Sequence, residues 1–283
     1  MPLVGAHESV AGGLHLAFDR LRQAGGEALQ IFTRNQRQWH PQALTAEEIA
    51  LFQQAWKESG ALPVSSHASY LINLASGKQE LIEKSITAFA GEINRCAKLG
   101  VPFVVIHPGS HGGDGVEVGL VRFARALDLA LAESEPGVTV LLETTAGQGS
   151  SLGHRFEHLA TIIEGIDDKA RVAVCLDTCH VFAAGYDIGT AEGAQATLRA
   201  FDKTIGLKRL VAIHINDSVK GLGSRVDRHA HIGQGLIGGA GLAALLTDKR
   251  LAKVPFLLET PKGEDLAEDR MNLAALRALA GQS

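Results

Sequence analysis

Cysteine is scarce in this sequence: only three of its 283 residues are cysteines. Cys96, Cys175 and Cys179 are too few and too unevenly spaced for a disulfide framework, so we expect a reducing, cytoplasmic environment. Cys175 and Cys179 flank Asp177, where they would be soft metal ligands. Cys175 lies inside an apolar segment, however, and this favours the alternative of a small buried core thiol.

An excess of either charge is also missing, because 27 basic residues nearly balance 31 acidic ones and the net charge is −4. This excludes a wholly basic surface for binding polyanions, although bound metal ions would add positive charge locally. No run of about 18 apolar residues occurs, and residues 1–13 lack a basic segment followed by an apolar one, so we expect no membrane association. No Pro- or Ser-rich linker interrupts the chain, which predicts a single domain, residues 1–283.

The most informative feature is a short apolar segment that ends in a histidine or an acid. Residues 172–176 are typical of a buried strand, and Asp177 and His180 come at its end. The pattern recurs at five places: residues 61–66 before His67, 103–106 before His107, 140–142 before Glu143, 211–213 before His214 and 256–258 before Glu259. Residues 3–7 and 28–33 complete eight predicted strands.

The six residues at these strand ends are separated by 40, 36, 34, 37 and 45 positions. The strand and helix units of a (β/α)8 barrel average about 31 residues before insertions. A single strand that ends in a histidine or acid usually carries a hydrogen-bonded core residue, but six in register favour a common site. We therefore predict an α/β fold, a single (β/α)8 TIM barrel whose C-terminal mouth gathers all six side chains.

Amphipathic segments predict helices between these strands, at residues 12–22, from Thr45 onward, and at 81–99, 119–132, 154–163 and 265–279. Glu47 and Glu48 favour a helix start after Thr45, because acidic groups stabilise the N-terminal end of the helix dipole. In the helix at 154–163, His158 is expected to face solvent without a role.

Further candidate ligands lie in the loops. Asp227 and His229 are two positions apart and point to the same side if their segment is extended. His111 is a second ligand beside His107, a residue that supports the ligands without binding metal, or a surface residue of its loop. The best-placed candidates number nine: His67, His107, Glu143, Asp177, His180, His214, Asp227, His229 and Glu259. One catalytic zinc uses three or four ligands, so nine indicate two or three divalent ions and a mouth near +2 charge, suited to a phosphate ester.

Two other loops carry side chains suited to nucleic acid. Residues 34–40 combine cationic groups, amides and Trp39, which would contact a phosphate backbone and stack on bases. The alternative is a solvated loop with Trp39 packed on the core. Tyr70 and Leu71 follow His67, and such large side chains either cover the barrel or enter a base stack.

Together these motifs closely resemble the endonuclease IV family of apurinic/apyrimidinic (AP) endonucleases, zinc-dependent DNA-repair enzymes on a TIM barrel. The resemblance runs from the first strand to the last, at residues 5–7 with 11–13, 35–39, 67–73, 107–111, 145–149, 176–188, and 227–229 with 233–235. One departure is visible: the family usually has lysine directly after Asn-Asp-Ala/Ser, whereas here Val219 precedes Lys220.

The resemblance implies three zinc ions, with Mn²⁺ or Fe²⁺ as alternatives at some sites. His67 and His107 would hold the first ion, and Glu143 would bridge it to the second. The second ion would also bind Asp177, His214 and Glu259. The third would bind His180, Asp227 and His229.

The resemblance also implies hydrolysis of the phosphodiester 5′ to an abasic site in double-stranded DNA, leaving a 3′-hydroxyl, and a 3′-end phosphodiesterase activity. A bridging hydroxide would be the nucleophile, with Glu143 orienting it and Glu259 as a candidate to activate it. Arg37, Tyr70 and Leu71 match the residues that enter the duplex. The family suggests a monomer.

A sugar isomerase or epimerase of the xylose-isomerase-like barrels is the main alternative. Glu143, Asp177, His214 and Glu259 would serve either activity. The other five candidate ligands have no evident use in an isomerase, which favours the nuclease. A non-catalytic protein, either with zinc as a structural clasp or as a DNA-binding module without chemistry, is also disfavoured. Structural zinc sites are rich in cysteine, and none of the nine candidates is a cysteine.

Overall fold

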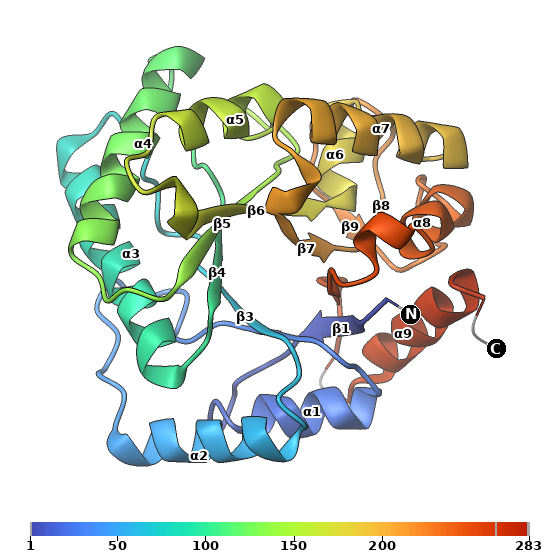
Figure 1. The fold of residues 1–283 in the computed structure, drawn as a ribbon, viewed down its shortest axis with the longest axis horizontal. Helices are drawn as coiled ribbons and strands as arrows, with labels where there is room; N and C mark the ends of the chain where they lie inside the picture. Colours follow the sequence, from blue (N-terminus) through green and yellow to red (C-terminus); the bar gives the residue numbers. More distant parts are fainter. Residues whose placement is uncertain (1, 264, 282–283) are drawn as a thin grey trace.

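Eight parallel strands close into a barrel (Figure 1). The computed structural model describes residues 2–263 and 265–281. Within this part of the chain, the order around the barrel is β1, β10, β7, β6, β5, β4, β3, β2. The strands are β1 (Val4–His7), β2 (Leu29–Ile31), β3 (Val64–His67), β4 (Phe103–Ile106), β5 (Thr139–Glu143), β6 (Val172–Asp177), β7 (Leu210–His214) and β10 (Phe256–Leu258). The predicted TIM barrel is confirmed.

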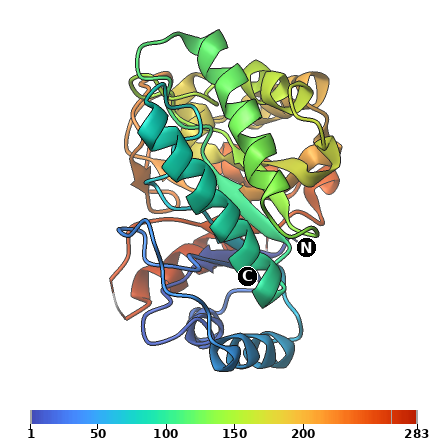
Figure 2. The ribbon, with the colours of Figure 1, turned by 90° about the vertical axis from the view of Figure 1, so that its left-hand side faces the viewer.

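Helices pack against the outside of this barrel. They are α1 (Leu16–Ala24), α2 (Ala46–Glu58), α3 (Gln79–Leu99), α4 (Val116–Ala132), α5 (Phe156–Glu164), α7 (Ala191–Thr204), α8 (Gly239–Leu246) and α9 (Ala267–Leu279). Figure 2 shows α3 and α4 side by side along one flank of the molecule. Each helix returns the chain to the bottom of the barrel, so all strands end at the same mouth.

Shorter elements lie in the connections. Helix α6 (Thr178–Ala184) follows β6 directly, and β8 (Asp217–Ser218) pairs antiparallel with β9 (His229–Ala230). Three 3₁₀ turns precede strands, at Lys169–Arg171, Leu207–Arg209 and Lys249–Leu251. The β8 and β9 pairing makes the backbone at His229 extended, which was the condition for Asp227 and His229 to point to one side.

Two predicted boundaries were wrong for local reasons. The first helix begins at Leu16 and not at Gly12, because Gly12 and Gly13 have positive φ angles of 84° and 148° that no helix accommodates. Strand β3 begins at Val64 and not at residue 61, because Ala61 has a left-handed φ of 56°. Thr45 does begin a helix: it caps α2 in a capping box with Glu48.

The core has two parts. Strand residues alternate between a large cluster shared with the helices and a small separate cluster, so the small cluster lies inside the barrel. The small cluster consists of Ala28, Val105, Leu141, Ala173, Cys175, Ala212 and Leu257. Cys175 is therefore a core thiol, as its apolar neighbours indicated.

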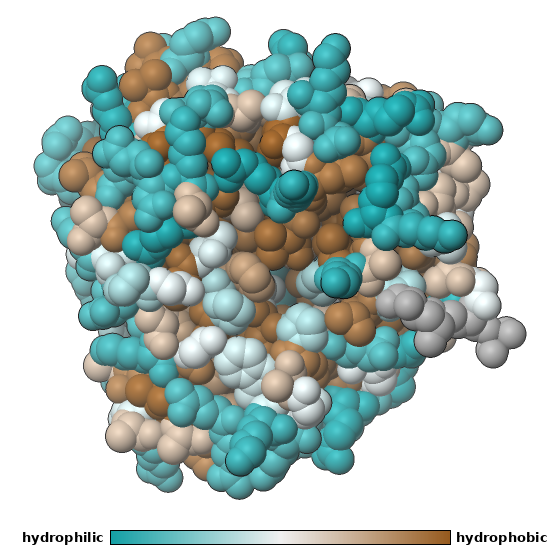
Figure 3. All heavy atoms as spheres, in the orientation of Figure 1, coloured by the Kyte–Doolittle hydropathy of each residue, from teal (hydrophilic) through white to brown (hydrophobic). Residues whose placement is uncertain are grey.

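One face of the molecule is mostly polar at its periphery (Figure 3). On the face drawn in Figure 3, hydrophilic residues surround the periphery and apolar residues are visible toward the middle. Within the described part of the chain, none of the helices has the length and apolar character needed to cross a membrane.

Candidate metal centre

The residues that the sequence placed at strand ends converge at the mouth of the barrel. His67, Glu143, Asp177 and His214 are the last residues of β3, β5, β6 and β7. His107 and Glu259 directly follow β4 and β10. Because the strands are parallel, their carboxyl ends lie at one edge, and this brings the six side chains together.

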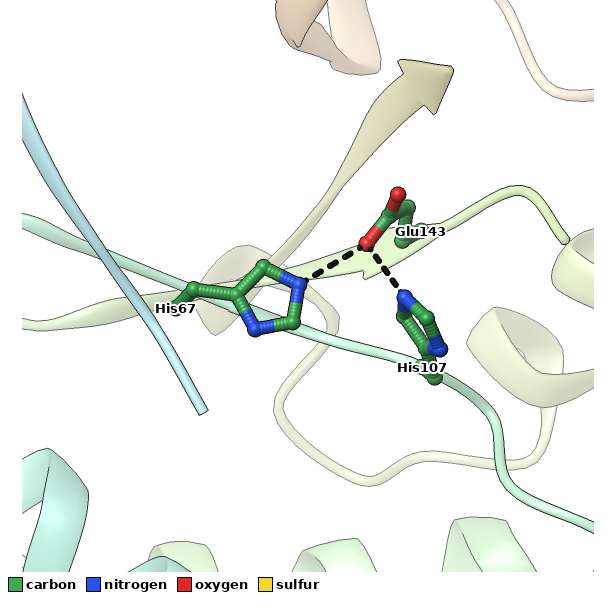
Figure 4. Close-up of side chains that lie close together, drawn as sticks. All are labelled: His67, His107 and Glu143. Atoms are coloured by element: carbon green, nitrogen blue, oxygen red, sulfur yellow. Dashed lines mark hydrogen bonds and ion pairs between the residues drawn. The ribbon is translucent and has the colours of Figure 1, made fainter. Parts of the chain in front are cut away.

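Glu143 lies at the middle of the site and is fully buried. Its Oε2 atom is 2.9 Å from His107 Nε2 and 3.1 Å from His67 Nε2. Figure 4 shows both imidazoles pointing at this same oxygen. Its Oε1 atom is 3.0 Å from His214 Nδ1 and 3.2 Å from His180 Nδ1. The two carboxylate oxygens thus face different pairs of histidines, as a bridging ligand requires.

The donor atoms form three groups, and within each group they lie within 4.8 Å of one another. The first group is His67, His107 and Glu143; the second is Glu143, Asp177, His214 and Glu259; the third is His180, Asp227 and His229. These are the three sets that the family resemblance implied. All nine candidate ligands therefore meet in one place, while their roles as ligands remain a prediction.

Carbonyl oxygens fix the ring orientation of three histidines. The Nδ1 atoms of His67, His180 and His229 donate to the backbone carbonyls of Ala68, Thr144 and Glu259, at 2.8, 2.8 and 3.0 Å. This arrangement leaves each Nε2 free of the backbone and directed into the site, the orientation of a metal-binding histidine. His229 Nε2 is buried and makes no hydrogen bond. An unpartnered buried nitrogen beside the carboxylates of Asp177 and Asp227 is suited to bind a cation.

Gln30 orients His214 and Glu259, and it was not identified from the sequence. Its carbonyl Oε1 accepts from His214 Nε2 at 2.9 Å, and its Nε2 donates to Glu259 Oε1 at 2.6 Å. This turns His214 Nδ1 toward Glu143 Oε1, at 3.0 Å, and Glu259 Oε2, at 3.1 Å. The available signal was an amide in the middle of an apolar strand, where a buried polar side chain requires a partner.

Asn216 supports the other side of the site. Its Nδ2 donates to Asp177 Oδ2 at 2.7 Å, and its Oδ1 accepts from the Glu259 backbone amide at 2.8 Å. Asp177 Oδ1 accepts from the His180 amide at 2.7 Å and so caps α6. The candidate ligands are therefore held by side chains that are themselves hydrogen-bonded, an arrangement that maintains metal-site geometry.

Electrostatics keep the acids ionised. Burial alone would raise the pKa of Glu143, but the neighbouring His107 and His214 outweigh it and hold the pKa well below its ordinary value. Burial also opposes ionisation of Glu259, and His214 again reverses the effect on its pKa. Both carboxylates are thus negatively charged at neutral pH, as ligands to a divalent cation must be.

This donor set fits divalent metal ions. Nitrogen and oxygen ligands of this kind suit zinc, and also manganese or iron. Cys179 forms a further group with Asp177 and His229. Its buried thiol has a pKa raised to about 12, and the Sγ atom donates to the Arg228 carbonyl at 3.6 Å. The cysteine is already engaged with the backbone, so the histidine and carboxylate set is the better candidate.

A pocket of about 390 Å³ opens above the centre. His67, His107, His180 and Asp227 form part of its wall, and Tyr70 lies at its edge with 66% of its surface exposed. Arg37 is also exposed, and Leu71 is half-buried. Neither is among the described residues that line the pocket.

The structure shows the positions of two further histidines, His158 and His111. His158 was expected to face solvent, which is wrong: it is only 7% exposed, and its Nδ1 accepts from the Gly153 amide. His111 Nδ1 accepts from the Gly113 and Gly115 amides, so this residue shapes its own loop.

The loop at residues 34–40 combines both interpretations that the sequence allowed. Trp39 packs partly buried against the core. Arg34 is buried, so it is not one of the cations available to a phosphate backbone. Arg37 and His40 are exposed. Lys220, shifted by the additional Val219, lies exposed outside the three ligand groups.

Comparison with known proteins supports the family resemblance. A family model described as "Xylose isomerase-like TIM barrel" matches residues 18–279. A protein named "Probable endonuclease 4" from Chloroflexus aggregans is 54% identical over 280 residues, covering 99% of this chain and 98% of that protein. A protein of the same name from Geobacter sulfurreducens is 50% identical over 98% of this chain and 94% of its own length.

Solved structures agree with this grouping. The crystal structure of endonuclease IV from Thermus thermophilus superposes with a TM-score of 0.88 at 42% identity, and each chain is covered completely. A D-tagatose 3-epimerase-like protein superposes with a TM-score of 0.73 at 18% identity, over 99% of this chain and 98% of that one, which shows a shared fold alone. This chain therefore belongs to the endonuclease IV family, within the xylose isomerase-like TIM barrels.

Proposed function

We propose that this protein is a metal-dependent AP endonuclease that hydrolyses the phosphodiester 5′ to an abasic site in double-stranded DNA and leaves a 3′-hydroxyl. The observation that carries the proposal is the set of three overlapping ligand groups around Glu143. The high identity to proteins named as endonucleases over nearly the whole chain supports it. We include a 3′-end phosphodiesterase activity, since it would use the same phosphodiester chemistry.

The proposed centre holds three zinc ions, one in each ligand group, and Glu143 is shared by the first two groups. Bound divalent ions would lower the pKa of water and stabilise charge on the attacking and leaving oxygens of a phosphodiester. Nine ligands exceed what a single ion uses, which supports more than one ion. The chain is proposed to act as a single domain, residues 1–283, and as a monomer.

Two carboxylates are proposed to be catalytic. Glu143 is fixed by four histidines, so its oxygens hold the nucleophile's position relative to the phosphorus. Glu259 Oε1 accepts from Gln30 and Oε2 faces His214, and this leaves an ionised carboxylate at the mouth as a proton acceptor. Their hydrogen-bond partners hold both groups rigidly before substrate arrives, which reduces the reorganisation needed for reaction.

DNA would approach through the loops beside the pocket. Arg37 and Tyr70 are exposed and Leu71 is half-buried, which is suitable for a phosphate contact and for two wedges into the base stack. A nucleotide that lacks its base has less stacking to lose when it leaves the duplex. The pocket of about 390 Å³ then suits a flipped abasic sugar and its phosphate.

The test is cleavage of a duplex with a single abasic site, with metal-loaded and chelator-stripped protein. We expect a 3′-hydroxyl product only with metal, and close to three zinc ions per chain by elemental analysis. An intact duplex is the control for non-specific nuclease activity. Cleavage that persists after verified metal removal, or no cleavage by metal-loaded protein, would show the proposal to be wrong.

A further inference from the structure

Helix α3 faces both loops that carry the proposed DNA contacts. We call residues 33–40 the Arg37 loop and residues 68–73 the Tyr70 loop. Three polar side chains on one side of α3 reach them: Ser85, Glu92 and Arg95. Ser85 Oγ accepts from the Asn73 amide at 3.0 Å, and Arg95 donates to the Thr33 and Gln42 carbonyls.

Glu92 is the buried centre of these contacts, with no exposed surface. Its Oε1 accepts from the backbone amide of Ser69 at 2.9 Å, directly before Tyr70. The same oxygen lies 3.6 Å from Arg34 Nε, in the other loop. One carboxylate oxygen therefore touches both loops.

Arg34 extends this contact through the Arg37 loop. It is 6% exposed, and its guanidinium donates to the backbone carbonyls of Gln38 and Trp39. The segment between Arg34 and Gln38 contains Arg37, so the guanidinium closes the loop from inside. Any displacement of Arg34 relative to Glu92 would move the base of this loop.

A second link joins the loops directly. Ser69 Oγ donates to the Gln36 carbonyl at 3.1 Å. Ser69 thus uses its amide to bind Glu92 and its hydroxyl to bind the Arg37 loop. Each of the three segments, the two loops and α3, therefore contacts the other two. These contacts fix the position of one loop relative to the other.

Stability alone does not account for an ion pair in this position. Burial raises the pKa of Glu92 to about 7, while the Ser69 amide and Arg34 oppose that shift. A buried ion pair is often no more stable than apolar side chains of similar volume, and specifying one arrangement is the better explanation for such pairs in some proteins.

We propose that Glu92 is a positioning residue for DNA, which acts through Ser69 and Arg34 to hold the Arg37 loop and the Tyr70 loop in one relative arrangement before the duplex binds. This inference rests on the proposed function. Loops that are ordered in advance lose less conformational entropy on binding, so the effect falls on substrate affinity and not on the chemical step.

The test compares Glu92→Gln with Glu83→Gln, a control that makes the same change at an exposed position of α3. Glutamine keeps an acceptor for the Ser69 amide but removes the charge beside Arg34. Two substrates are used with the metal-loaded protein: an abasic duplex, and bis(4-nitrophenyl) phosphate, which needs the metal centre but is too small to reach both loops.

For Glu92→Gln we expect KM for the abasic duplex to rise about tenfold, with kcat and hydrolysis of the small diester within about twofold of wild type. Glu83→Gln should leave all three values unchanged. Ser69→Ala removes the hydroxyl that donates to the Gln36 carbonyl and accepts from the Leu71 amide, so it should raise KM about threefold. It provides a second test that keeps Glu92 in place.

An unchanged KM in Glu92→Gln and Ser69→Ala overturns the inference. A parallel fall in duplex cleavage and small-diester hydrolysis also overturns it, because that result indicates general damage to the centre. Failure of the proposed function appears separately, as a wild-type protein that hydrolyses the small diester but does not cleave the abasic duplex.

Discussion

Two sets of buried or half-buried histidines near the barrel mouth have opposite electrostatic surroundings. In the candidate metal centre, burial lowers the pKa values of His67 and His180, but Glu143 and Asp177 reverse this effect and raise them. Beside it, His154 and His158 face each other with ring centroids 4.6 Å apart. Burial lowers the pKa of His158 to about 4, and the charges of His154 and Arg155 act in the same direction.

The difference shows what turns a buried histidine into a candidate ligand. In the centre, one ring nitrogen is fixed by a carbonyl and the other faces a carboxylate, so a cation between them would be stabilised by both. In the second set, the ring nitrogens bind backbone groups instead: His158 Nδ1 accepts from the Gly153 amide and His154 Nδ1 donates to the Ser151 carbonyl. Residue type alone does not distinguish the two sets; the carboxylate partner does. The predictions that follow test this contrast in decreasing order of their effect on cleavage.

The largest effect is expected for the centre itself. His107→Ala and Glu259→Gln should each reduce abasic-site cleavage by more than about 100-fold, since even the loss of a ligand's outer partner costs about 10- to 100-fold. The fold should survive, as measured by circular dichroism and thermal unfolding. His158→Gln is the matched control, with cleavage close to wild type. If either centre variant keeps normal turnover, its assigned role is wrong.

Loss of the Gln30 side-chain amide should have a smaller effect on cleavage than loss of a candidate ligand. Gln30→Ala removes the partner of both His214 and Glu259, so we expect zinc affinity to fall about 10- to 100-fold. Competition with a chelator at fixed free zinc measures this. Gln53→Ala, an exposed position on α2, serves as the control. Equal zinc affinity in the two variants would remove Gln30 from the site.

Tyr70→Ala should affect substrate selection more than chemistry. Stacking of an aromatic side chain on a base contributes about 1 to 3 kcal/mol, so binding to an abasic duplex should weaken about tenfold. Binding to an intact duplex should weaken less, because no base has to be replaced there. The comparison requires dissociation constants for both duplexes under one salt condition. Equal losses would mean that Tyr70 only packs against its aromatic neighbours Phe32, His67 and His107.

Substitution of His158 should change the pH dependence of the free energy of unfolding and leave cleavage unaffected. The pKa of His158 is about 4 in the folded protein and about 6.5 when unfolded, so below pH 6.5 the unfolded chain binds the additional proton. Its contribution to the free energy of unfolding is therefore present above pH 6.5 and falls by about 2 kcal/mol by pH 5. His158→Gln should lack this loss. Denaturant unfolding of the wild type and His158→Gln at pH 7.5 and 5 measures this difference. An identical pH dependence of the two proteins would contradict the lowered pKa of His158.

The sequence predicted the nine-residue cluster because its information is local and periodic. A strand of known direction followed by a helix places the next residue at the mouth, and repetition brings six such residues together without knowledge of their contacts. Asp227 and His229 followed from the same kind of argument, since an extended segment directs alternate residues to one side. The helix start at Thr45 was predictable because its capping box involves residues 45–48 alone.

What supports these residues was decided only by the folded chain. Gln30 meets Glu259 across 229 positions of sequence, and Glu92 meets Ser69 from the inner side of a helix. Arg34 is a residue type suited to a phosphate contact, but it is buried. His158 was expected at the surface, but it lies inside the protein. Periodicity predicts which face of an element points inward, but hydrogen-bond partners depend on distances of a few tenths of an ångström between distant segments. The folded barrel determines those distances, because it brings the distant segments together.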